Sequence, residues 1–127
     1  MKDGMKILIA YDGSINSKHA LEEALILAKK FSASITLLHC YWEQSEQAST
    51  LLLRGDKKKI DESGVKFDLV SFNTRNPSAE ILSMAEEKKY DMIFVGSRGM
   101  GGAQAWLLGS VSSKVAAEAH VPVVVVK

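Results

Sequence analysis

Short apolar runs alternate with amphipathic stretches along the whole chain. The runs are compact and rich in branched side chains, which is the pattern of strands buried in a sheet. They predict strands at residues 5–11, 34–40, 65–72, 92–95 and 122–126. The third run partly alternates apolar with polar positions, so we expect its strand to have one wetter face near a sheet edge.

Between these runs, apolar side chains recur at the spacing of helices. Residues 17–31 form the clearest case, with Ser14 or Ser17 as the cap. Residues 51–62 form a weaker helix, which contains Gly55 and stops at Gly64. Asn76 and Pro77 open a third helix, because Asn caps well and Pro has a φ suited to the first helical position. Residues 110–119 form the last helix.

The resulting order, βαβαβαβαβ, predicts an α/β fold. Crossover helices of this kind imply an open five-stranded parallel sheet with right-handed connections and helices on both faces. The chain has 127 residues, which suits one domain spanning 1–127. In such a sheet, ligands sit beyond the carboxyl ends of the strands, where the strand order reverses.

Composition excludes several classes of protein. The net charge of +1, with 16 basic and 15 acidic side chains, gives no electrostatic reason to expect a nucleic acid or a membrane surface as partner. No stretch approaches the roughly 18 apolar residues of a membrane span. The chain has a single cysteine, Cys40, so no internal disulfide forms, and we expect a reducing, cytoplasmic location.

A glycine-rich segment follows the fourth predicted strand. Gly96 and Gly99 remove side chains where backbone amides would approach a phosphate, and Arg98 supplies a cation. Gly109 and Ser110 then open the last helix, whose first amides would point at the same anion. The alternative is turn punctuation, since Gly commonly follows strands and precedes helices. The segment is not a Walker A loop, which requires Lys beside the Ser.

Four further residues have two interpretations each. Asp12 follows the first strand, where it either binds ribose or Mg²⁺ or turns the chain through its own backbone. His39 and Cys40 lie inside an apolar strand, which favours buried structural roles over zinc ligation. Trp106 either packs under the loop or stacks on a base.

The spacing Gly96-x2-Gly99-x9-Gly109-Ser110 resembles the ATP-binding motif of the universal stress protein family. The resemblance covers nearly the whole chain in matched blocks. They are ILIAYDGS (7–14), ITLLHC (35–40), NPSAEIL (76–82), YDMIFVGSRG (90–99), LLGSVSSKV (107–115) and VPVVVVK (121–127). The chain departs from the family in its short segment between the second and third strands and in Arg75 before Asn76.

The resemblance implies a strand order of 3-2-1-4-5, in the adenine nucleotide α-hydrolase-like fold, and a set of site residues. Ala10 would line the adenine pocket, the backbone at Cys40 would read the adenine edge, and Asp12 would meet the ribose or Mg²⁺. The matches to the ribose and phosphate positions are Gly96, Arg98, Gly99, Gly109, Ser110 and Val111. Apart from Mg²⁺ through Asp12, no metal is expected.

The function implied by the resemblance is a stress-response regulatory protein that binds ATP. ATP would act as a ligand or signal with at most slow hydrolysis, because no general base stands beside the proposed γ-phosphate position. The alternative is an enzyme, a weak ATPase or another nucleotide-processing enzyme, that uses Asp12 and a divalent metal. Family members commonly dimerise through the last strand, so we expect a homodimer through residues 121–126, an apolar sheet edge.

Overall fold

The structure is a computed structural model that describes residues 4–98 and 109–127. Gly99 and Trp106, two residues given possible roles above, lie outside the described residues. The strands form one parallel sheet in the order β3-β2-β1-β4-β5, which confirms the predicted topology. The strands are β1 (Lys6–Ala10), β2 (Ser34–Tyr41), β3 (Phe67–Asn73), β4 (Met92–Gly96) and β5 (Val123–Val126).

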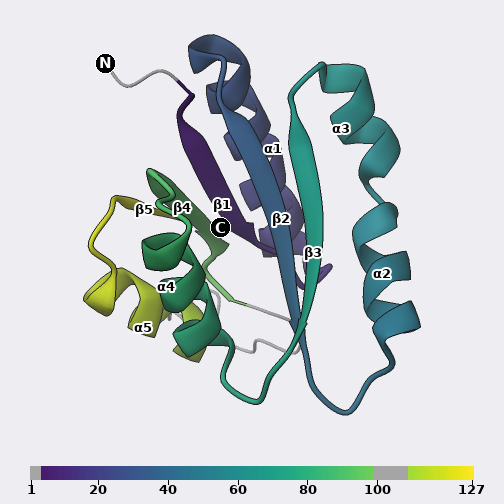
Figure 1. Cartoon of the computed structure of the whole chain (residues 1–127), viewed down its shortest axis with the longest axis vertical. Helices are drawn as coiled ribbons and strands as arrows, with labels where there is room; N and C mark the ends of the chain where they lie inside the picture. Colours follow the sequence, from purple (N-terminus) through teal and green to yellow (C-terminus); the bar gives the residue numbers. More distant parts are fainter. Residues whose placement is uncertain (1–3, 99–108) are drawn as a thin grey trace.

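Helices cover both faces of this sheet (Figure 1). On one face lie α1 (Ile15–Phe31), α2 (Glu46–Arg54) and α3 (Lys57–Ser63), and on the other lie α4 (Pro77–Glu87) and α5 (Ser110–Glu118). The period of two along a strand divides the core between these layers. Ile7 and Ile9 of β1 pack under α1 to α3, whereas Leu8 packs under α4 and α5.

The helix ends follow the chemistry expected of them. The side chain of Ser14 accepts a hydrogen bond from the amide of Ser17, so Ser14 is the cap of α1. Asn76 accepts a hydrogen bond from the amide of Ala79, with Pro at the first helical position of α4. The predicted stripe of α1 is buried from Ala20 to Ala28, but its last member, Phe31, is 43% exposed.

The prediction of a single helix over residues 51–62 is wrong. The structure has two helices there, and the first begins at Glu46, inside a stretch whose polar sequence gave no signal. Ser45 supplies that start, because its side chain accepts a hydrogen bond from the amide of Ala48. The break falls at Gly55 and Asp56, so the element order contains one more helix than simple alternation predicts.

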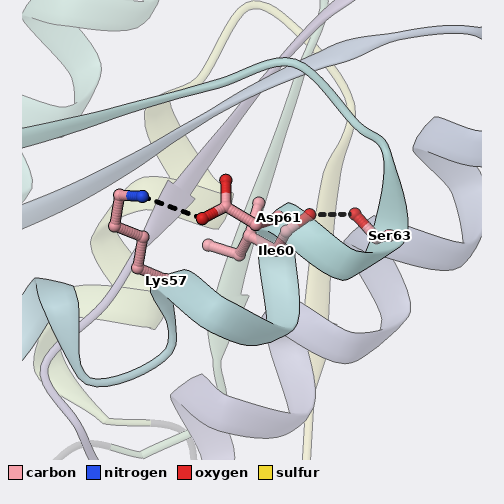
Figure 2. Close-up of polar contacts among 4 residues, drawn as sticks. All are labelled: Lys57, Ile60, Asp61 and Ser63. Carbon is pink, nitrogen blue, oxygen red and sulfur yellow. Dashed lines mark hydrogen bonds and ion pairs between the residues drawn. The ribbon is translucent and has the colours of Figure 1, made fainter.

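The short helix α3 is stabilised locally as well as by packing. Lys57 pairs with Asp61 one turn later, and the hydroxyl of Ser63 donates to the carbonyl of Ile60 (Figure 2). The Ile60 side chain is fully buried beneath α1, while the lysine run at 57–59 is exposed. The run is therefore a solvated helix face, as expected of consecutive charges.

Candidate functional site

The strand order reverses between β1 and β4. These two strands are parallel neighbours, with Ile9 opposite Phe94, but the helices that follow them, α1 and α5, lie on opposite faces of the sheet (Figure 1). The loop after β1 and the segment after β4 therefore flank one crevice at the carboxyl edge. This is the topological switch point at which open α/β sheets bind ligands.

A cavity of about 520 Å³ occupies this switch point. Its volume lies within the range of small-molecule sites. The structure brings eight of the nine predicted site residues to its wall, and the ninth, Gly99, lies outside the described residues. The eight are Ala10, Asp12, Cys40, Gly96, Arg98, Gly109, Ser110 and Val111.

The cavity wall combines an apolar part with a polar part. Leu38, Ile81 and Val95 line the cavity and also belong to the core under α4 and α5, so the apolar wall continues that core. Polar groups come from the ends of β1 and β4 and from the first turns of α1 and α5; they are Asp12, Ser14, Ser17, Arg98, Ser110 and Ser112. Such a lining suits a ligand with one flat, weakly polar part and one charged part.

The amino end of α5 opens onto the cavity. Gly109 is its cap residue and supplies no side-chain hydrogen bond to the first turn, so a ligand can meet the amides of Ser110 and Val111 at the positive end of the helix dipole. The turn itself is held to β4, because the amide of Gly109 and the hydroxyl of Ser112 both donate to the carbonyl of Ser97, at 2.6 and 2.8 Å.

The loop after β1 is shaped by its own hydrogen bonds. Asp12 Oδ1 accepts the amide of Ser14 at 2.9 Å, and Ser17 Oγ donates to the carbonyl of Ser14 at 2.9 Å. Asp12 also lines the cavity. Its carboxylate therefore turns the chain and also faces the space where a ligand would bind, so the two interpretations of Asp12 are compatible. Gly13 lies between Asp12 and Ser14 and has φ +81°, a backbone conformation that favours glycine. A Cβ at Gly13 would also lie 2.6 Å from Cδ1 of Leu52.

Packing gives Gly96 a reason to be glycine in addition to the expected approach of a phosphate. A Cβ at Gly96 would lie 2.8 Å from the carbonyl carbon of Asn16 and 2.9 Å from the amide nitrogen of Ser17. The missing side chain thus permits the end of β4 to pack against the first turn of α1. Asn16 strengthens this contact, since its side-chain amide donates to Ser97 Oγ at 3.1 Å. This packing requires glycine here whether or not a phosphate also approaches Gly96.

Cys40 and His39 lie side by side in β2 but on opposite sides of the sheet. Cys40 is partly buried against the core under α4 and α5, and burial, with a smaller contribution from Glu80, raises the pKa of its thiol to about 12. His39 is buried, and its Nδ1 lies 2.6 Å from Ser49 Oγ of α2. Among the residues that the structure describes, no three His, Cys, Asp or Glu side chains gather as a metal site.

Sequence reasoning missed several residues of the cavity wall. They are Tyr11, Ser14, Ser17, Leu38, His39, Gln44, Pro77, Ile81, Val95 and Ser112. A partial signal existed for Ser14 and Pro77, since both open helices that start at the carboxyl edge of the sheet. His39 also had one, as a polar residue inside an apolar strand. The others contribute to the wall only through tertiary packing.

The fold and the crevice define a doubly wound α/β protein with a ligand-sized cavity at its switch point. The chain belongs to the universal stress protein family, whose model matches residues 5–127. It is 34% identical to the universal stress protein YxiE of Bacillus subtilis, over 96% of this chain and 98% of that protein. It is also 34% identical to a universal stress protein of Methanocaldococcus jannaschii, over 96% of this chain and 81% of that one.

Solved structures of this family share the fold. The universal stress protein UspA from Lactobacillus plantarum superposes with a TM-score of 0.84 over the full length of both chains, at 19% identity. A universal stress protein in complex with cAMP gives 0.82 over 98% of both chains, at 23% identity. The universal stress protein from Archaeoglobus fulgidus in complex with dAMP gives a TM-score of 0.80 at 21% identity, over 97% of this chain and 98% of that one. A family protein from Arabidopsis thaliana with AMP bound gives 0.75 at 23% identity, over 97% of this chain and 91% of that one.

Across residues 4–98 and 109–127, every helix falls short of the length and apolar character that crossing a bilayer requires.

Proposed function

We propose that the cavity between β1 and β4 binds an adenine nucleotide, with ATP as the ligand. The observation that carries this proposal is the convergence of the predicted residues from two separate segments on one cavity at the switch point. Related folds in complex with cAMP, dAMP and AMP support the adenine part of the proposal. The polyphosphate part is supported by the open amino end of α5 and by Arg98.

The nucleotide would lie with its base against the apolar wall and its phosphates at α5. Ala10 and Cys40, which pack against the core under α4 and α5, would flank the base. Asp12 would face the ribose, and it is the lining carboxylate available to a Mg²⁺ ion that accompanies the phosphates. The amides of Ser110 and Val111, together with Arg98, would hold the phosphates.

Calorimetric titration with ATP, ADP and AMP tests the binding proposal. Ala10→Leu places a larger side chain in the cavity wall without a new backbone conformation, so we expect ATP to bind at least about tenfold more weakly, about 1.4 kcal/mol. Ala117→Leu is the matched control, because Ala117 is an exposed residue of α5 and its replacement should leave the affinity unchanged. Absence of ATP binding to the unaltered protein at millimolar concentration contradicts the proposal.

Gly109 is a poorer position for a steric block. A Cβ at Gly109 would lie 3.3 Å from the carbonyl oxygen of Ser97 and 3.4 Å from Cα of Arg98. A larger residue there would shift the segment after β4 as well as obstruct the ligand. Loss of binding in such a variant would therefore not identify the phosphate site.

We also propose that ATP serves as a regulatory ligand in a stress response rather than as a rapidly consumed substrate. Steady-state release of phosphate separates the two functions. Turnover well below about 1 per second supports the regulatory role, whereas turnover within the ordinary enzyme range supports the alternative ATPase that uses Asp12 and a divalent metal.

Residues 121–126, which contain β5, are the proposed homodimer contact. β5 is an edge strand, and β4 occupies only one of its sides. Ile93 and Ser97 donate to the carbonyls of Pro122 and Val126, so the alternation of a parallel ladder turns the amide of Val125 away from β4. Val125→Pro removes that outward donor and leaves the hydrogen bonds between β5 and β4 in place, although its ring also replaces a side chain that packs against the core under α4 and α5. Light scattering should show a dimer at tens of micromolar for the unaltered protein and a monomer for the variant; an unaltered protein that is monomeric contradicts the proposal.

A further inference from the structure

His39 is a buried polar residue at the wall of the cavity that the site described above leaves without a role. Its ring is on the α1 to α3 side of β2, and the residue is 6% exposed. It lines the same cavity as Asp12. A polar ring at this depth has its protonation and hydrogen bonds set by its neighbours.

Three hydrogen-bonding side chains meet in a row at His39. Ser49 Oγ, which is fully buried, lies 2.8 Å from Ser71 Oγ of β3 and 2.6 Å from His39 Nδ1. Ser49 has one hydroxyl hydrogen, so it donates to one of these two neighbours and accepts from the other. We take Ser49 to donate to Ser71 and His39 Nδ1 to donate to Ser49.

In this arrangement the second ring nitrogen is an acceptor. Burial lowers the pKa of His39, against the smaller opposing effect of the Asp12 carboxylate, so the ring is neutral near pH 7 and Nε2 keeps a lone pair. Among the described residues, the only hydrogen bond of this ring is the one to Ser49. His39 also lines the cavity, and with Nδ1 held by Ser49, Nε2 is the ring nitrogen left to meet a ligand there.

We propose that His39 Nε2 accepts a hydrogen bond from a ribose hydroxyl of the bound nucleotide. A lone pair cannot bond an ionised phosphate oxygen, which is itself an acceptor, so the partner must be a donor. The ribose hydroxyls are the donors placed beside Asp12, whose charge acts on the His39 ring. This inference rests on the proposed nucleotide site and adds to it a residue that selects ribonucleotides over deoxynucleotides.

His39→Asn separates this role from the structural one. The Asn side-chain amide can still donate to Ser49, but the variant has no acceptor at the position of Nε2. We expect the unaltered protein to bind ATP about three- to tenfold more tightly than 2′-deoxy-ATP or 3′-deoxy-ATP, the factor that one neutral hydrogen bond provides. In His39→Asn, we expect that preference to disappear. Ser49→Ala keeps Nε2 but releases the tautomer, so its preference should be intermediate.

Nitrogen NMR of the unaltered protein gives a readout that does not depend on a variant's folding. We expect the Nδ1–H tautomer of His39 without ligand and a shift of the Nε2 signal when ATP is added; a ring protonated on Nε2 overturns the inference. If ATP binds but His39→Asn keeps the full sugar preference, His39 has no such role and the proposed function stands. Inosine triphosphate, which lacks the amino group of adenine, is the control for the base. If the unaltered protein binds ATP more tightly than inosine triphosphate, shows no preference over deoxy-ATP, and loses the first preference in His39→Asn, the contact is to the base amino group and the inference is wrong. Failure of ATP to bind at all removes the proposed function itself.

Discussion

Gly96→Ala is the sharpest test of the packing between β4 and α1. The added methyl would lie 2.8 Å from the carbonyl carbon of Asn16 and 2.9 Å from both Asn16 Cβ and the amide nitrogen of Ser17. Separations under 3 Å are essentially never found for real Cβ atoms, and two of these three neighbours are backbone atoms. The first turn of α1 or the end of β4 must therefore move.

The expected cost follows from this overlap. Overpacking a well-filled region costs typically 1–3 kcal/mol, and we expect about 3 kcal/mol here, because backbone cannot rotate away as a side chain can. For a chain of this length, such a loss lowers Tm by about 10 °C. It is also a large share of the roughly 5–15 kcal/mol by which native proteins are stable.

Urea denaturation followed by circular dichroism measures this loss, with Gly64→Ala as the control. Gly64 has φ +77°, and a Cβ added there would meet nothing within 4 Å, so the control carries only the cost of a left-handed backbone, about 1–2 kcal/mol. Gly96→Ala should lose clearly more stability than Gly64→Ala. An equal or smaller loss would refute the view that close packing against α1 requires glycine at this position.

Three further predictions concern the groups around the cavity. Ser112→Ala removes one of the two donors to the carbonyl of Ser97 and leaves the amide of Gly109 as the other, so urea denaturation should show a loss of about 0.5–1.5 kcal/mol, whereas Ser113→Ala, at an exposed position, should change little. Burial, followed by the hydrogen bond to Asp56, raises the pKa of Tyr11, so its contribution holds below pH 10 and is lost above it; stability should fall more steeply above pH 10 than in Tyr11→Phe, and parallel curves would contradict this. Cys40 is the only cysteine, and with its pKa at about 12 its alkylation rate should rise about tenfold per unit from pH 7 to 9 and fall with saturating ATP; a rate that ATP leaves unchanged would place the nucleotide elsewhere.

Most of the fold was predictable because its signals are local. Buried parallel strands are short apolar runs, and Ser14 and Asn76 cap helices through contacts within a few residues. The start of α2 escaped prediction although Ser45 caps it locally, because the stretch before Leu51 has no apolar stripe to mark a helix. Only Ser49 and Leu53 of α2 are buried, and a buried Ser is invisible to a pattern of hydrophobicity.

The sequence named most residues of the candidate site, but it did not reveal the structural role of each one. Asp12, Arg98 and the Gly109–Ser110 pair were named from the sequence, and the structure gathers them at one cavity. The role of Gly96 was not predictable, because the atoms that exclude a Cβ belong to Asn16 and Ser17, some 80 positions away in the chain. The hydrogen-bond partner of His39 was equally hidden, since Ser49 and its neighbour Ser71 belong to two other elements.

Patterning and local capping chemistry therefore settle the five strands and every helix except the α2–α3 region, and they point to the carboxyl edge of the sheet as the place for a ligand. These are interactions between residues close in sequence, or properties of one side chain. The tertiary structure alone decides that the end of β4 packs against the first turn of α1 at Gly96 and that Ser49 of α2 meets the ring of His39. No local signal makes β1 and β4 neighbours either, and the sequence implied that pairing only through its resemblance to the family. Each of these depends on contacts between segments distant in the chain, which burial and hydrogen bonding select only when the whole sheet is assembled.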